Sequence, residues 1–93
     1  ITLKVEPAGN LPEMLPRLGF EYYFTKSFSH IQWYGRGPFE TYPDRKSGAK
    51  VGVYKSNVND EYIPYIIPQD HGNHSDVRQL TIENSEGRGI RIS

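Results

Sequence analysis

Residues 33–46 read WYGRGPFETYPDRK and say more about the fold than any other stretch of the chain. Glycine and proline prevent a long helix here, and a plain solvated loop would not carry so many aromatic side chains. The mixture predicts a strand that ends in a fixed turn, with aromatic and charged groups meeting on one surface. Such a surface suits sugars, because their C–H faces stack on rings while their hydroxyls hydrogen-bond to carboxylate and guanidinium groups.

Outward from this stretch, short apolar–polar alternations of period two are separated by turn residues, which is typical of antiparallel β-proteins. No segment keeps a helical period beyond one or two turns. The predicted strands are residues 2–6, 18–24, 31–34, 49–55 and 77–83, and a last strand that follows a hairpin turn at residues 84–87. Residues 62–68 are apolar but interrupted by prolines, so we expect them on an edge or in a packed extended segment. The sequence therefore predicts an all-β fold, an antiparallel β-sandwich.

The same alternation predicts which side chains face the core. Phe20, Tyr22 and Phe24 share one face of their predicted strand, because every second residue of a strand points the same way. Val51 and Val53 are likewise expected to face inward. All five side chains are therefore expected in the core.

Gly35 and Gly37 flank Arg36 near the end of a predicted strand. A G-x-G pair is too short for a dinucleotide fingerprint, and no helix follows that could hold a phosphate. We expect the two glycines to permit a positive φ and a close backbone approach before Pro38.

The composition excludes several classes of function. The 93 residues carry 11 basic and 11 acidic side chains, so the net charge of zero favours neither nucleic acid nor an anionic membrane as a partner. Without cysteine the chain holds no disulfide and no Cys-ligated zinc, which is compatible with the cytoplasm. Hydrophobic residues make up 35% of the chain, which predicts a thin core. Both ends alternate like strands, so we expect residues 1–93 to be a single domain or a fragment of a longer protein.

Two carboxylates in the opening stretch, Glu40 and Asp44, are close enough in sequence to suggest the acid and base of a glycosidase. Each has a guanidinium nearby, Arg36 or Arg45, and such partners hold a carboxylate ionised and disfavour the acid role. We therefore interpret Asp44 and Arg45 as a structural ion pair and assign no catalytic residue.

His71 and His74, with Asp70 and Asp76 nearby, are the one candidate metal site. Their spacing lacks the helix that would bring the side chains onto one face, and no third soft ligand is present. We therefore interpret residues 69–76 as a polar loop and predict no metal in this chain.

Several aromatic and polar side chains are candidates for binding carbohydrate or for an interface. Trp33 is more often a packed core anchor than a sugar platform, whereas a tyrosine tolerates both water and protein around it. The candidates are Trp33, Tyr34, Glu40, Tyr42, Asp44, Arg45, Gln69 and Asn73.

Four blocks of sequence carry a family resemblance. They are WYGRGP at residues 33–38, ExYPDR at 40–45, YxPYxxPQxxGN at 62–73 and DVR at 76–78. In this order they resemble the start of the C-terminal domain of bacterial β-galactosidases of glycoside hydrolase family 2, the region also found as a small chain. The resemblance covers nearly the whole chain. It implies that residues 1–93 are the N-terminal portion of an antiparallel super-sandwich similar to galactose mutarotases.

The resemblance also implies a parent enzyme that cleaves terminal β-galactosides with retention. In such enzymes the two catalytic glutamates lie on a central barrel, with magnesium and sodium beside them, and none of those residues has a counterpart here. We therefore expect a non-catalytic structural segment of a β-galactosidase that contacts the remaining domains or subunits and meets substrate only through the parent. A bacterial cytoplasm is expected, with the periplasm left open.

Two alternatives stay open. One is a stand-alone carbohydrate-binding module in which Trp33, Tyr34, Tyr42 and Asp44 hold a β-galactoside. The other is a mutarotase-like sugar epimerase, which would need His71 or His74 paired with Glu40 in one cleft. In either case neither nucleic acid nor membrane is a partner. We also expect the fragment to self-associate through open sheet edges.

Overall fold

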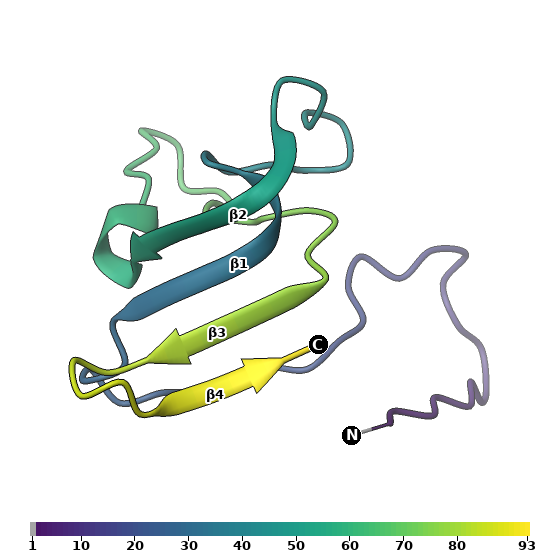
Figure 1. The fold of residues 1–93 in the computed structure, drawn as a ribbon. Helices are drawn as coiled ribbons and strands as arrows, with labels where there is room; N and C mark the ends of the chain where they lie inside the picture. Colours follow the sequence, from purple (N-terminus) through teal and green to yellow (C-terminus); the bar gives the residue numbers. More distant parts are fainter. Residues whose placement is uncertain (1) are drawn as a thin grey trace.

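One antiparallel sheet organises the computed structural model, which describes residues 2–93 (Figure 1). Its strands are β1 (His30–Gly37), β2 (Lys50–Asn57), β3 (Gln79–Glu83) and β4 (Gly89–Ile92), in the order β2-β1-β3-β4. A short 3-10 helix, η1 (Val58–Glu61), follows β2. The predicted all-β, antiparallel architecture is confirmed, and the sheet is consistent with a β-sandwich domain.

The register gives the sheet two different faces. Trp33 lies opposite Tyr54 on one side and Leu80 on the other, and Ile82 lies opposite Ile90. Because directly opposed residues of antiparallel strands point to the same side, large apolar side chains collect on one face. We call this the apolar face; its members are Ile31, Trp33, Tyr54, Leu80, Ile82, Ile90 and Ile92.

The predicted inward direction of Val51 and Val53 is wrong. Both side chains are exposed, Val53 by 62%. The register explains the difference, because Tyr54 is the residue opposite Trp33 and its neighbours in β2 must therefore point to the other face. Period-two alternation predicts the strand but does not predict which of its two faces lies against the core.

The two glycines of β1 serve close packing. A Cβ built on Gly35 would lie 2.8 Å from Cα of Val77, and one on Gly37 would lie 2.8 Å from the ring of Tyr54. The predicted close approach is confirmed, but the predicted positive φ is wrong. Positive φ occurs at other glycines, among them Gly72.

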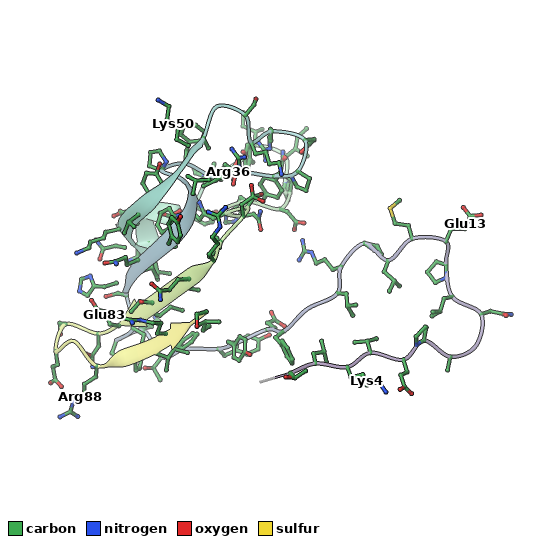
Figure 2. All side chains as sticks on the ribbon, turned by 45° about the vertical axis from the view of Figure 1, so that its right-hand side comes forward. Lys4, Glu13, Arg36, Lys50, Glu83 and Arg88 are labelled. Atoms are coloured by element: carbon green, nitrogen blue, oxygen red, sulfur yellow. The ribbon has the colours of Figure 1, made fainter. Side chains whose placement is uncertain are left out.

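Residues 2–24, which we call the arm, form no strand, so the strands predicted at residues 2–6 and 18–24 are wrong for this structure. The arm leaves the sheet and loops away from it (Figures 1 and 2). Phe20, Tyr22 and Phe24 are exposed rather than buried in the core, Phe20 by 54%. A strand needs a neighbour for its backbone hydrogen bonds, and no described strand pairs with the arm. Among residues 2–93, no helix is both long and apolar enough to cross a membrane.

Candidate functional site

The candidate residues gather only in part. Glu40, Tyr42, Arg45 and Asn73 lie together beyond the end of β1, where the turns after Gly37 meet the loop that precedes β3. We call this group the Glu40 cluster and add to it Tyr65, Gly72, Thr41 and Ser75, which contact it directly. Trp33, Tyr34, Asp44 and Gln69 lie elsewhere.

Glu40 is the centre of the cluster, and its side chain is only 8% exposed. Its carboxylate accepts hydrogen bonds from the hydroxyl of Tyr65 and, at 2.8 Å, from the backbone N–H of Gly72. It also forms an ion pair with Arg45, whose Nη1 lies 3.2 Å from Oε1. Burial alone would raise the pKa of Glu40, but the hydrogen bonds from Tyr65 and Gly72, with the charges of Arg45 and His71, outweigh burial and hold this pKa below its ordinary value. Glu40 is therefore a buried, ionised acceptor.

Arg45 covers the cluster with its guanidinium. It lies 4.5 Å from the ring centre of Tyr42 and 5.9 Å from that of Tyr65, and Nη1 donates to the Tyr65 hydroxyl at 3.1 Å. The hydrogen bond with Tyr65 is the main cause that raises the pKa of Arg45. The guanidinium thus combines stacking on aromatic rings with pairing to a carboxylate, which suits arginine better than lysine.

The predicted ion pair of Asp44 with Arg45 is wrong, because Arg45 pairs with Glu40 instead. A tight turn explains this, since the N–H of Arg45 donates to the carbonyl of Tyr42 at 3.0 Å. The turn folds Arg45 back over the Tyr42 ring and toward Glu40. Asp44, in the middle of the turn, is exposed and makes no ion pair with any residue of the described range 2–93.

Thr41 is fully buried and links the turns that follow β1 to the loop that precedes β3. Its N–H donates to the carbonyl of Asn73 at 2.6 Å, and Asn73 Nδ2 donates back to the carbonyl of Thr41 at 2.7 Å. The Thr41 hydroxyl accepts the N–H of Ser75 at 2.7 Å. Neither Thr41 nor Ser75 is marked by the sequence, because a single small polar residue carries no local pattern that predicts its burial.

Arg36, in β1, ties the loop that precedes β3 to the sheet. Its Nε lies 2.5 Å from Asp76 Oδ2, and its Nη1 donates to the carbonyls of Ala49 at 2.8 Å and Lys46 at 3.2 Å. The hydrogen bond from Arg36 is the main cause that lowers the pKa of Asp76, and Lys46 adds to it. Arg36 therefore serves Asp76 and two carbonyls rather than Glu40.

Trp33 and Tyr34 are adjacent in β1 and so point to opposite faces of the sheet. Trp33 is 2% exposed, packs 4.1 Å from the ring of His74 and donates from Nε1 to the carbonyl of Arg36 at 2.9 Å. Its interpretation as a core anchor is confirmed, so it offers no sugar platform. Tyr34 is exposed and stacks under Arg78, 5.2 Å from its guanidinium carbon.

The two histidines make their side-chain contacts with residues other than Glu40. His74 Nε2 lies 2.8 Å from Glu61 Oε2, and the His71 ring meets the edge of Tyr62 at 5.0 Å. Neither imidazole makes a hydrogen bond or ion pair with Glu40 within the part of the chain that the structure describes, so the pair that an epimerase needs is not assembled. Residues 2–93 hold no group of three His, Asp or Glu side chains suited to a metal ion.

Gln69 is exposed, and its amide donates to the carbonyl of Ile67 at 3.4 Å. The Tyr42 hydroxyl is buried without a hydrogen-bond partner among the described residues, and burial raises its pKa.

Taken together, these contacts hold the one buried carboxylate of the Glu40 cluster ionised and hydrogen-bonded. A general acid must instead be protonated near the working pH. The arrangement locks two loops onto a sheet, and an ionised Glu40 does not suit the role of a general acid.

A family model described as "Beta galactosidase small chain" matches residues 1–93, the whole chain. The chain belongs to the beta-galactosidase small-chain family. The resemblance predicted from the four sequence blocks is therefore confirmed.

Relatives of the small-chain family support this assignment. The chain is 42% identical over 92 residues to a "Beta-galactosidase" of Priestia megaterium, covering 99% of this chain and 9% of that protein. It is 40% identical over 87 residues to "Beta-galactosidase BgaC" of Bifidobacterium adolescentis, covering 94% and 8%. A "Beta-galactosidase" of Kluyveromyces lactis is 41% identical over 78 residues, covering 84% and 7%, so the family is not confined to bacteria. The chain spans less than a tenth of the length of each of these relatives.

Proposed function

We propose that this chain is a non-catalytic structural segment of a β-galactosidase, and that the whole enzyme hydrolyses terminal β-D-galactosides with residues outside these 93. Support comes from the small-chain family and from relatives whose printed names are "Beta-galactosidase". The observation that carries the non-catalytic role is the state of Glu40. Its carboxylate is buried, ionised and hydrogen-bonded by Tyr65 and Gly72 beside the Arg45 guanidinium, so it lacks the proton that the general acid of glycoside hydrolysis must carry.

In this proposal the Glu40 cluster keeps the loops around β1 in one shape, and this shape is what the remaining domains or subunits contact. In this proposal magnesium and sodium, where the enzyme uses them, are held by those other parts. The β-galactoside substrate likewise binds to the assembled enzyme. The outer strands β2 and β4 each have one unpaired edge, so the isolated chain should self-associate at high concentration.

A nitrophenyl-galactoside assay tests the proposal with two proteins, the isolated chain and the full polypeptide that carries it. We expect turnover by the full polypeptide and none by the isolated chain. Glu40→Gln in the full polypeptide should lower thermal stability while leaving the shape of the pH–rate profile unchanged. Clear turnover by the isolated chain would contradict the structural role, as would loss of one limb of the pH profile on substitution of Glu40. A full polypeptide inactive on every β-galactoside would contradict the assignment of the parent.

A further inference from the structure

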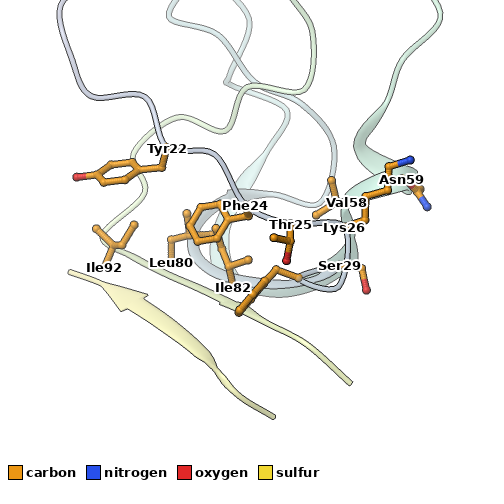
Figure 3. Close-up of a pocket in the computed structure, with 11 residues that line it drawn as sticks. Tyr22, Phe24, Thr25, Lys26, Ser29, Val58, Asn59, Leu80, Ile82 and Ile92 are labelled. Atoms are coloured by element: carbon orange, nitrogen blue, oxygen red, sulfur yellow. The ribbon is translucent and has the colours of Figure 1, made fainter. Parts of the chain in front are cut away.

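The sheet has a second face, opposite the apolar face. The apolar face borders a groove of about 750 Å³, which lies between the end of the arm and strands β3 and β4 (Figure 3). Residues that alternate with the apolar ones along each strand point to the other side of the sheet. We call that side the polar face; one row across its four strands consists of Lys55, Gln32, Thr81 and Arg91.

A hollow of about 290 Å³ opens beside this row. Five of the seven residues that line it point to the polar face by register: His30 and Gln32 of β1, Lys55 and Asn57 of β2, and Glu83 of β3. His30 lies opposite Asn57 on one side and Glu83 on the other, and Gln32 lies opposite Lys55. We call this site the β1 hollow. No residue that lines it belongs to the Glu40 cluster.

The five side chains of the β1 hollow make no polar contact with one another. Within residues 2–93, none of them forms an ion pair or a side-chain hydrogen bond. Lys55 and Glu83 carry opposite charges but come from the two strands that flank β1, whose backbones are about 10 Å apart. This separation leaves room for a ligand between the ammonium and the carboxylate.

The chemistry of the β1 hollow favours a neutral ligand. The charges of Lys55 and Glu83 cancel, so the site attracts neither an anion such as phosphate nor a cation. The amides of Gln32 and Asn57 and a neutral His30 imidazole each donate and accept hydrogen bonds. A molecule with several hydroxyls can use all of these groups, because every hydroxyl both donates and accepts.

The size of the hollow narrows the choice further. Pockets for drug-sized ligands hold about 300–1,000 Å³. The β1 hollow lies at the small end of this range and suits a ligand of a single ring.

We propose that the β1 hollow binds one pyranose ring of a neutral sugar. The ammonium of Lys55 donates to sugar oxygens, the carboxylate of Glu83 accepts from sugar hydroxyls, and the amides of Gln32 and Asn57 do both. The site goes beyond the proposed function; the choice of galactose as the probe rests on that function.

A zwitterion such as a free amino acid is also neutral overall. Its two charges are one carbon atom apart, however, whereas Lys55 and Glu83 come from strands about 10 Å apart with the amide of Gln32 between them. An amino acid cannot reach both charges and leaves the amides unused. A sugar ring, with hydroxyls around its edge, meets them from all sides.

Chemical labelling of lysines in the full polypeptide tests the proposal. The rate at which an N-hydroxysuccinimide ester acetylates each lysine is measured by mass spectrometry at increasing galactose concentration. We expect half-maximal protection of Lys55 at about 1–10 mM galactose, as for an open site with few contacts. At ten times that concentration Lys55 should react about tenfold more slowly, because only the empty site reacts. Lys50 lies on the same strand but does not line the hollow, so its rate should not change.

Glu83→Gln in the full polypeptide keeps the size of the side chain and removes its charge. It should raise the galactose concentration needed to protect Lys55 by about tenfold, because a charge-assisted hydrogen bond is lost. Glu86→Gln is the matched control, since Glu86 belongs to the hairpin turn and does not line the hollow. It should leave the protection of Lys55 unchanged.

Four results would overturn the proposal. Galactose gives Lys55 no protection, or it protects Lys50 and Lys55 equally, which is a general effect of added sugar. Glycine protects Lys55 where galactose does not, which identifies a zwitterion site. Lys55 fails to react even without sugar, which means that the rest of the polypeptide covers the hollow. None of these readouts depends on turnover, so failure of the nitrophenyl-galactoside assay and failure of the sugar site are distinguishable.

Discussion

Replacing Glu40 by glutamine should destabilise the chain by about 2–4 kcal/mol. Glutamine keeps the size of the side chain but has one acceptor oxygen instead of two. One oxygen of the Glu40 carboxylate accepts from Tyr65 and pairs with the charge of Arg45, and the other accepts from the backbone N–H of Gly72. An amide can serve only one of these two sets, so at least one buried donor is left facing an NH₂ group.

The expected loss of unfolding free energy in Glu40→Gln follows from the surroundings of the groups that contact Glu40. An unsatisfied buried donor costs about 1–3 kcal/mol, and exchanging a charge-assisted hydrogen bond for a neutral one costs about 1 kcal/mol more. The ion pair with Arg45 adds little, because the arginine side chain is about half exposed and solvent screens the pair. For a small domain with an m-value near 1 kcal/mol per molar urea, the unfolding midpoint should fall by about 2–4 M.

Trp33 provides the assay. It is the only tryptophan and is almost fully buried, so its fluorescence follows global unfolding in urea. Asp44→Asn is the matched control, since it removes the same charge from an exposed residue without an ion pair in the described range, and it should change stability by less than about 0.5 kcal/mol. Equal effects of the two substitutions, or a larger effect at Asp44, would refute the assignment of Arg45 to Glu40.

The pH dependence offers a second check on Glu40. Its pKa is lower in the folded chain than its ordinary value near 4.5, so the ionised form stabilises the fold. This stability is fully present above pH 4.5 and is lost as the pH falls through the folded pKa. The difference in free energy of unfolding between the original chain and Glu40→Gln should therefore be constant at neutral pH and shrink in acid. A difference that grows in acid would refute the reasoning.

Three further outcomes are expected. Gly35→Ala should lower the free energy of unfolding by about 1–3 kcal/mol, because the new Cβ would lie 2.8 Å from a neighbouring backbone atom. Gly19→Ala, where a Cβ would meet no atom within 4 Å, should be neutral or slightly stabilising in the same urea titration. Arg36→Lys should lower the free energy of unfolding by about 1–3 kcal/mol, because lysine cannot reach Asp76 and the Ala49 carbonyl together. Thermal melting measures this effect, and an unchanged melting temperature would contradict the role of Arg36. Adding a β-galactoside to the isolated chain should leave the Trp33 fluorescence unchanged, because the ring is enclosed; a saturable change would revive the carbohydrate-binding alternative.

Local pattern sufficed for the parts of the fold whose partners lie close in sequence. The hairpin of β3 and β4 follows from alternation around the turn at residues 84–87, and the strand ahead of Gly35 follows from the aromatic run. The same alternation in residues 18–24 predicts a strand that is not formed. Pairing depends on a distant neighbour, which no local pattern contains.

The candidate site shows the same division. Glu40 and Arg45 are predictable from sequence because they are charged and lie among aromatic residues. Adjacency in sequence favours Asp44 as the partner of Arg45. The turn reverses the chain and brings Arg45 to Glu40 instead. Trp33 and Tyr34 look equivalent in sequence, and only the choice of the core face separates them.

The order β2-β1-β3-β4 has a consequence for how this segment is made. The central strand β1 pairs on one side with β2, soon after it in the chain, and on the other with β3, about half the chain length later. A ribosome that adds about 5–20 residues per second exposes the β1–β2 hairpin roughly 1–6 seconds before β3 leaves the tunnel. During that interval Trp33 and Tyr54 lie on a hairpin whose β1 edge is not yet paired with β3. A nascent chain stalled at this point should bind chaperones more strongly than one stalled well after β4.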